Sequence, residues 1–338
     1  MSEQQFSLGF GSEPDPTVAT VTAKTRQPKK STQPDSSGVM PTLEEQARSL
    51  EQHPDYRVLR RLVPSLHFDR AAQGETKRVI VLDTETTGLN SDRDKIIELA
   101  MLLVTVDELS GLPCGDVQVY DGLEDPGQPI TKEIEAITGI NDEMVKGQRL
   151  DQKQINDLLA GVDLVIAHNA AFDRPFVEER LPQFKSLAWG CSFAAIDWKS
   201  LGHGSAKLEN LAHDFGLFYE AHRAEIDCHA LLAVLSQSVS GRTGFSHILS
   251  ASQAPCYRLQ AVAAPFEAKD LLKARGYRWN PEQRVWHTRL PDEAALQLEY
   301  AWLKTEVYGN RSVRIQIEKL DAKVNFSSRS GLLSTPSL

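Results

Sequence analysis

The sequence predicts a mixed α/β protein with a disordered N-terminal tail and a small α/β domain near its C-terminal end. Short apolar runs rich in β-branched residues alternate with segments whose apolar residues recur at three- and four-residue spacing. Residues 1–40 are rich in Ser, Thr, Gln, Pro and Lys and poor in large apolar groups. With 338 residues, 41% of them hydrophobic and 25% charged, the chain is typical of a soluble globular protein.

The N-terminal elements precede the first buried strand. We expect residues 1–40 to be disordered, because they cannot bury enough apolar surface to fold. Residues 41–76 form a helical lead-in, which opens with Thr42 and Glu45 of "PTLEEQARSLEQ", the signature of a capping box. The stretch "YRVLRRLV" is expected to add a second short helix.

Residues 77–240 have the pattern of one α/β domain. Three strands with short connections, suited to an antiparallel meander, are predicted in "KRVIVLDTE", "KIIELAMLLVTV" and "DVQVYDGL". Helices are then expected in "TKEIEAIT" and "DQKQINDLLAG", a fourth strand in "DLVIAHN", a helix in "FDRPFVEERLPQF" and a fifth strand in "WGCSFAAIDW". The domain closes with two helices, "SAKLENLAHDFG" and "EIDCHALLAVLSQSVS".

A smaller unit follows a linker at residues 241–256. Residues 257–326 are expected to form a small basic α/β domain with a strand, a helix, the hairpin "YRWNPEQRVWHTRL", a second helix and a final strand. Residues 327–338 are expected to be a polar tail.

Charge is distributed unevenly along the chain, whose formal net charge is −9. Residues 71–256 carry 15 basic and 28 acidic side chains, whereas residues 257–338 carry 13 and 9. No apolar run approaches the roughly 18 residues that span a bilayer, so no contact with a membrane is expected. The absence of a secretory pattern and four widely separated cysteines favour reduced thiols and a location in the bacterial cytoplasm.

Candidate functional residues begin in "VIVLDTETTGL", where a buried strand ends in Asp83 and Glu85. Side chains two positions apart in a strand point to the same face, so these carboxylates lie side by side. Asp173 follows the fourth strand, and Asp227 starts the last helix, five residues after His222. If the four carboxylates gather, repulsion in a low dielectric requires bound cations or protonation.

The residue types in this cluster indicate which cation it binds. Oxygen ligands without cysteine favour Mg²⁺ or Mn²⁺ over zinc. Two such ions close together commonly catalyse nucleophilic displacement at the phosphorus atom of a phosphate ester. His222 supplies a base that can take a proton near neutral pH. The pattern therefore predicts a metal-dependent hydrolase of phosphodiester bonds.

The segments "DTETTG", "HNAAFD" and "HRAEID" resemble, in order and spacing, the three motifs of the DEDDh 3′–5′ exonucleases. Within that superfamily, residues 77–240 are most similar to the proofreading epsilon subunits of bacterial DNA polymerase III. The resemblance implies a ribonuclease-H-like mixed sheet flanked by helices, and release of nucleoside 5′-monophosphates from the 3′ end of DNA, single-stranded or frayed, in proofreading or repair.

The resemblance also assigns roles to individual residues. Asp83, Glu85 and Asp227 hold the tighter of two metal ions, and Asp83 and Asp173 contact the second. His222 activates the attacking water. The terminal nucleotide is lined by four further residues: Thr84, Thr86, Leu89 and Asn169. Gly88 permits the turn that lets this nucleotide approach.

Alternative functions stay open at this point. An exoribonuclease that trims RNA ends has the same motifs, because selection of the sugar depends on packing around the 2′ position. A non-catalytic nucleic-acid-binding subunit is disfavoured, since no metal-binding carboxylate is missing. A nucleotide-binding oxidoreductase is excluded by the lack of a G-x-G-x-x-G motif after the first strand.

Two segments outside the motifs suggest further contacts. The predicted hairpin interleaves arginines with aromatic rings, and its candidate contacts with nucleic acid are Arg278, Trp279, Arg284 and Trp286. The alternative is that its tryptophans form the core of the small domain. In the tail, "QFSLGF" resembles peptides that dock on the bacterial sliding clamp through Gln5, Leu8 and Phe10. The sliding clamp and DNA polymerase III are therefore the candidate protein partners.

Overall fold

The computed structural model describes residues 40–338, which fall into two compact units that divide after Gln52. The described part of the first unit is helix α1 (Leu43–Glu51). Its predicted capping box is present: the Thr42 hydroxyl accepts a hydrogen bond from the Glu45 amide, and the Glu45 carboxylate accepts one from the Thr42 amide. The predicted disordered tail and the peptide with Gln5, Leu8 and Phe10 lie outside the described residues.

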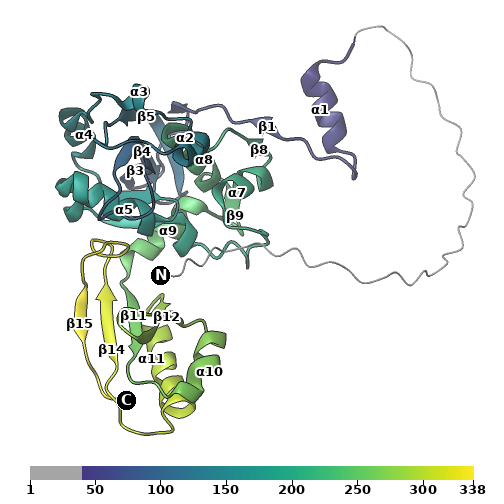
Figure 1. Ribbon diagram of the computed structural model, residues 1–338. Helices are drawn as coiled ribbons and strands as arrows, with labels where there is room; N and C mark the ends of the chain where they lie inside the picture. The colour runs from purple at the N-terminus through teal and green to yellow at the C-terminus, as the bar shows by residue number, and fades with distance from the viewer. Residues whose placement is uncertain (1–39) are drawn as a thin grey trace, which may run out of the picture. The chain divides into compact units, whose positions relative to one another are not determined.

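The second unit contains a six-stranded mixed sheet in the order β2-β5-β4-β3-β6-β7. Figure 1 labels its central strands β3, β4 and β5. The predicted meander is confirmed, because β3 pairs antiparallel with β4 and β4 with β5. Strands β6 and β7 run parallel to β3, so the carboxyl ends of these three strands meet at one edge of the sheet. The bounds are β2 His67–Phe68, β3 Thr76–Thr86, β4 Ile96–Asp107, β5 Leu112–Leu123, β6 Leu164–Ala167 and β7 Trp189–Cys191.

Helices cover both faces of this sheet. Val79 and Val81 of β3 pack on one face with residues of α7, α8 and α9, whereas Ile80 and Leu82 pack on the other with residues of α4 and α5. These four side chains are fully buried, and burial of each contributes roughly 1.5–3 kcal/mol to stability. That burial fixes the strand whose end carries the candidate carboxylates.

The helices of this part of the chain complete the two layers. Ile130, Ile140 and Val145 form a further small core with Ile97 of β4, around α2 and α3. The bounds are α2 Lys132–Thr138, α3 Asp142–Val145, α4 Gln152–Leu159, α5 Ala170–Arg180, the 3₁₀ helix η1 Pro182–Ser186, α6 Ser192–Ala195, α7 Leu208–Asp214, α8 Ala224–Leu235 and α9 Gly244–Gln253.

Three local predictions differ from the structure. The stretch "YRVLRRLV" forms no helix, because Arg60–Arg61 (β1) pairs as a parallel strand with Leu217–Phe218 (β8). The fifth strand ends at Cys191, after which α6 begins. The linker at 241–256 contains the short hairpin strand β10 (Arg242–Thr243), which pairs with β9 (Ser238–Val239), and then α9.

Helix α9 is stabilised by a capping residue at its N-terminus and by burial of its apolar side chains. The Thr243 hydroxyl accepts a hydrogen bond from the Ser246 amide and so caps the helix. Phe245 and Ile248 are fully buried in the core beneath the large sheet. Tertiary burial therefore selects a helix in a segment of weak intrinsic preference.

The C-terminal residues form a five-stranded antiparallel sheet in the order β12-β13-β11-β14-β15. Its strands are β11 Cys256–Ala261, β12 Arg278–Asn280, β13 Val285–Leu290, β14 Gln316–Leu320 and β15 Leu332–Ser334. Its helices are the 3₁₀ helix η2 Phe266–Ala268, α10 Lys269–Ala274, α11 Glu293–Trp302 and the π-helical turn η3 Leu303–Val307. Strand β15 lies in the segment that was expected to be a polar tail.

The connection between β14 and β15 contacts helix α5 of the large sheet. The fully buried guanidinium of Arg174 donates hydrogen bonds to the carbonyl oxygens of Ala322 and Asn325, and also pairs with Glu178. Glu178 accepts a further ion pair from Arg329. Residues His53–Leu338 are one compact unit, so the predicted domain boundary near residues 241–256 stays a prediction. None of the described helices is long and apolar enough to cross a bilayer.

Candidate active site

The end of β3 brings together three carboxylates. Asp83 and Glu85 point to the face of the sheet covered by α8, and Asp227 lies in the first turn of that helix. One oxygen from each lies within 4.8 Å of one from each of the others. Three hard oxygen donors at this separation fit a single divalent cation such as Mg²⁺ or Mn²⁺, with no sulfur ligand to favour zinc.

Asp227 is held by hydrogen bonds from the chain that leads into α8. Its Oδ1 accepts from the Tyr219 hydroxyl at 3.0 Å, and its Oδ2 accepts from the amides of His222 at 2.7 Å and Arg223 at 3.1 Å. His222 adopts a left-handed backbone conformation with φ of 70°, which is uncommon for a residue other than glycine. The conformation turns its amide toward Asp227 and leaves its side chain exposed beside the cluster.

Asp173 reaches the same edge from the opposite layer. It lies in the first turn of α5, is 2% exposed, and accepts a hydrogen bond from the Thr84 hydroxyl at 2.8 Å. Thr84 points to the α5 face of the strand, between two residues that point to the α8 face. Asp173 therefore lies beside Asp83 without belonging to the group of three carboxylates.

Burial and mutual repulsion raise the pKa values of the clustered carboxyl groups. Burial, then the charges of Asp173 and Asp227, raise the pKa of Asp83 well above its usual value. Burial, followed by the charges of Asp227 and Glu98, raises the pKa of Glu85 to about 8. Burial raises the pKa of Asp173 to about 7, although the hydrogen bond from Thr84 acts to lower it. A cation would remove this repulsion, which is the physical sense in which the residues fit a metal.

Glu98 is a fifth carboxylate of this site, which the sequence-based prediction missed. It is fully buried on β4, directly opposite Glu85. Its oxygens accept from the Arg223 guanidinium, including Nη2 at 2.5 Å, and from the Ala224 amide at 2.8 Å. The signal was present in the sequence: Glu98 is a lone acid inside the apolar run "KIIELAMLLVTV". The ion pair between Glu98 and Arg223 fixes the start of α8 and therefore the position of Asp227.

The residues predicted to line a terminal nucleotide lie around the same strand end. Thr86 is buried and donates its hydroxyl to the Gly88 carbonyl at 2.6 Å, whereas Leu89 is 86% exposed on the following turn. Asn169 precedes α5 in a left-handed conformation, and its side chain makes no capping hydrogen bond. A Cβ at Gly88 would lie 2.6 Å from a carboxylate oxygen of Asp94, so this tight turn requires glycine.

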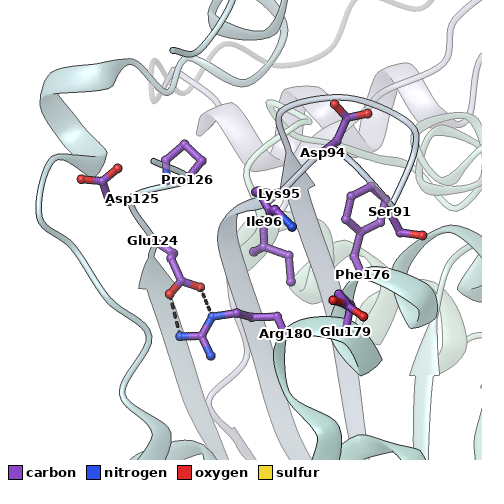
Figure 2. Close-up of a pocket in the computed structure, with 10 residues that line it drawn as sticks. All are labelled: Ser91, Asp94, Lys95, Ile96, Glu124, Asp125, Pro126, Phe176, Glu179 and Arg180. Carbon is purple, nitrogen blue, oxygen red and sulfur yellow. Dashed lines mark hydrogen bonds and ion pairs between the residues drawn. The ribbon is translucent and has the colours of Figure 1, made fainter. Parts of the chain in front are cut away.

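A separate pocket lies on the α5 side of the large sheet (Figure 2). Its wall includes Phe176, Asp94 and Pro126, and the Arg180 guanidinium pairs with Glu124 there at 2.6 Å. None of the four predicted metal-binding carboxylates lines this pocket, so it is distinct from the acidic cluster.

The predicted contacts of the C-terminal hairpin differ from one another in their surroundings. Trp286 packs against the core of the small sheet, and its ring centre lies 5.5 Å from that of Trp279, which is 48% exposed. Arg278 on β12 and Arg284 in the turn are exposed, and Arg284 has a φ of 53°.

Fold and site together define an oxygen-donor acidic centre at the carboxyl edge of a mixed sheet. Residues 80–235 match the model of the RNase_T family, which is described as exonuclease. The match therefore covers most of β3, strands β4 to β7 and the acidic centre.

Curated relatives of this segment include proteins named for DNA polymerase III. The chain is 32% identical over 174 residues to the DNA polymerase III PolC-type protein of Halalkalibacterium halodurans, covering 48% of this chain and 11% of that protein. It is 28% identical over 183 residues to the DNA polymerase III subunit epsilon of Treponema pallidum, covering 51% of this chain and 82% of that subunit. The match thus spans about a ninth of the PolC-type relative.

Among solved structures, the chain is similar to exonuclease X in complex with 5′ overhanging duplex DNA. The identity is 25% and the TM-score 0.36, and the alignment covers 50% of this chain and 99% of that one.

Proposed function

We propose that the protein is a 3′–5′ exonuclease that hydrolyses the terminal phosphodiester bond of a DNA strand and releases nucleoside 5′-monophosphates. The observation that carries the proposal is the convergence of Asp83, Glu85 and Asp227 within 4.8 Å, with Asp173 adjacent, inside a segment that matches the exonuclease family model. The names of the replication relatives favour DNA as the substrate.

The carboxylates are proposed to bind two divalent ions, Mg²⁺ or Mn²⁺. Asp83, Glu85 and Asp227 would hold one ion, and Asp83 with Asp173 would hold the other. When bound, such ions neutralise the carboxylates and stabilise charge that develops on the phosphate during displacement.

His222 is proposed to take the proton from the attacking water. Its side chain is exposed beside the acidic cluster, and its backbone is fixed by the hydrogen bond from its amide to Asp227. Imidazole is the side chain best suited to accept a proton near neutral pH. Tyr219, Arg223 and Glu98 would act by holding Asp227 and His222 in place.

The terminal nucleotide is proposed to lie over the end of β3. The exposed Leu89 would pack against the base or sugar, and the uncapped Asn169 side chain is free to hydrogen-bond to it. The hydroxyls of Thr84 and Thr86 are already donated to Asp173 and Gly88. These two residues would therefore contribute their backbone groups rather than their hydroxyls.

The proposal extends to partners through the sequence outside the described residues. Docking on a sliding clamp through Gln5, Leu8 and Phe10 would bring the nuclease to replicated or repaired DNA. Replacing all three residues with alanine should abolish binding of the full chain to the cognate clamp, and undiminished binding would contradict this part of the proposal.

The test of the function uses 5′-labelled single-stranded DNA, and RNA of the same sequence, with Mg²⁺. The full chain should produce a ladder that shortens from the 3′ end on DNA. Asp227→Ala should produce none, whereas Asp157→Asn, which changes an exposed acid of α4, should act like the wild type. Degradation of RNA alone would refute DNA as the substrate, and an undiminished ladder with Asp227→Ala would refute the site.

A further inference from the structure

The five-stranded C-terminal sheet has one face covered by helices and one that is not. Leu259 and Ile317, which pair directly, are buried in a core with Leu272 of α10 and Leu296 of α11. Trp279, Trp286 and Ala261 also pair in one row, on this same face. The tryptophans of the hairpin therefore face the helices.

The alternate residues form two rows on the opposite face, which we call the open face. The first row consists of Arg278, His287, Gln260 and Gln316, taken in order across β12, β13, β11 and β14. The second row, two residues along each strand, consists of Arg289, Arg258, Glu318 and Leu333, of which Glu318 is only 6% exposed. Strand alternation has thus separated the arginines of the hairpin from its aromatic rings.

The open face carries more positive charge than its own residues neutralise. Glu318 pairs with Arg258 at 2.8 Å. Neither Arg278 nor Arg289 forms an ion pair with a carboxylate in the described part of the chain; Arg289 lies over the Phe326 ring and bonds to the side chain of Asn325. Burial, then the charges of Arg258 and Arg278, lower the pKa of His287.

The arrangement of these charges is unfavourable in isolation. Arg258 and Arg289 are direct cross-strand partners. Like charges in such positions destabilise a sheet, and a bound anion would remove the repulsion. Because β13 lies between them and the two rows are two residues apart, the Cα atoms of Arg278 on β12 and Arg258 on β11 are about 12 Å apart. One small anion does not reach both, whereas a chain of phosphates does.

We propose that the open face binds the sugar–phosphate backbone of single-stranded DNA through Arg278, Arg289 and Arg258, with the Gln316 amide as a further donor; the Gln260 amide already donates to Gln283. The choice of ligand rests on the proposed function, since residues 71–256 carry a net charge of −13 and themselves repel a polyanion. The open face would hold a stretch of the strand while its 3′ end is hydrolysed.

The first test measures binding without catalysis. Fluorescence anisotropy of a labelled oligothymidylate of about 20 nucleotides, longer than a typical single-strand site, is followed against salt in chelator with the full chain. Arg278→Gln/Arg289→Gln should weaken binding about tenfold or more and reduce the slope of log K against log salt by about 1.4, since each phosphate contact contributes about 0.7.

The matched control is Lys273→Gln/Lys304→Gln, which makes the same change in net charge on exposed residues of α10 and η3. It should leave the slope unchanged. Equal losses in the two double variants would show that only overall charge matters, and an unchanged slope in the first would remove the open face as a site. Either result overturns the proposal.

Two further measurements distinguish loss of DNA binding at the open face from misfolding and from loss of nuclease activity. Arg278→Glu alone tests the face without disturbing the contacts of Arg289, and should also weaken binding. Arg278→Gln/Arg289→Gln should hydrolyse the p-nitrophenyl ester of thymidine 5′-monophosphate at the wild-type rate, while its KM for long single-stranded DNA rises. If the wild type binds DNA with the expected slope but hydrolyses nothing, the proposed function fails and the open face stands.

Discussion

The replacement Glu85→Gln tests the electrostatic account of the acidic centre through stability rather than activity. Burial, with the charges of Asp227 and Glu98, raises the pKa of Glu85 from 4.5 to about 8. Between those pH values the folded chain holds a proton that the unfolded chain has released. The free energy of unfolding therefore falls as pH rises through this window, by up to about 1.4 kcal/mol per pH unit.

The full window corresponds to roughly 5 kcal/mol, which is an upper bound. Neighbouring carboxylates share protons, so protonation of one relieves the others, and we expect about 2–3 kcal/mol. Glutamine keeps the shape of the side chain and stays neutral at every pH. In chelator, Glu85→Gln should match the wild type at pH 5 and melt several degrees higher at pH 8, at roughly 2 °C per kcal/mol.

Differential scanning calorimetry at pH 5 and pH 8 measures the effect, with Glu143→Gln on the exposed surface of α3 as the control. Adding Mg²⁺ at pH 8 should raise the melting temperature of the wild type more than that of Glu85→Gln, because the variant has lost a charged ligand. If Glu85→Gln and the wild type lose stability equally between pH 5 and pH 8, the account of repulsion at Glu85 is wrong.

Three further changes probe the surroundings of the site. His222→Ala should lower turnover most near neutral pH and still be stabilised by Mg²⁺ in a thermal melt; unchanged turnover would remove His222 as the base. Glu98→Gln should weaken the fixation of α8 and lower kcat about tenfold or more with little change in KM for the substrate, as for a positioning group, and an unaltered kcat would contradict it. Arg174→Ala should destabilise the fold by roughly 3 kcal/mol, measured by denaturant unfolding, because the buried Glu178 loses a partner.

The strand that carries the site could be predicted from the sequence because its signal is local. Val79–Leu82 form an apolar run between polar residues, and the two-residue period alone places Asp83 and Glu85 on one face. The antiparallel meander follows from short connections between long strands. These features need no knowledge of which helix packs where.

The position of Asp173 could not be predicted without knowing which face of the sheet its helix covers. Its place after a strand was visible in the sequence, but whether α5 packs on the α8 face or on the opposite face is decided by tertiary packing. The structure places α5 on the opposite face, so Asp173 meets Thr84 and only its edge position brings it near Asp83. The same reason explains α9, whose burial of Phe245 and Ile248 is invisible in a sequence pattern.

The hairpin shows how a composition pattern can be read too broadly. Interleaved arginine and tryptophan suggested one surface that pairs phosphates and stacks bases, but residues that alternate along a strand cannot share a face. Placing Trp286 in the core leaves Arg278 on the open side, where no carboxylate of residues 40–338 pairs with it. A grip on DNA built from these residues is therefore expected to depend on salt more than on base identity.

Glu98 contributes both to the position of α8 and to the electrostatics of the acidic centre. A carboxylate in the middle of an apolar strand is unfavourable unless its oxygens are satisfied, and here they accept from Arg223 and from the first amide of α8. The same negative charge raises the pKa of Glu85 and so adds to the repulsion among the carboxylates. Glu98 fixes Asp227 and also adds negative charge beside the other carboxylates. Both effects increase the affinity of the site for a cation. Loss of Glu98 should therefore weaken metal binding as well as geometry, which distinguishes it from a purely structural ion pair.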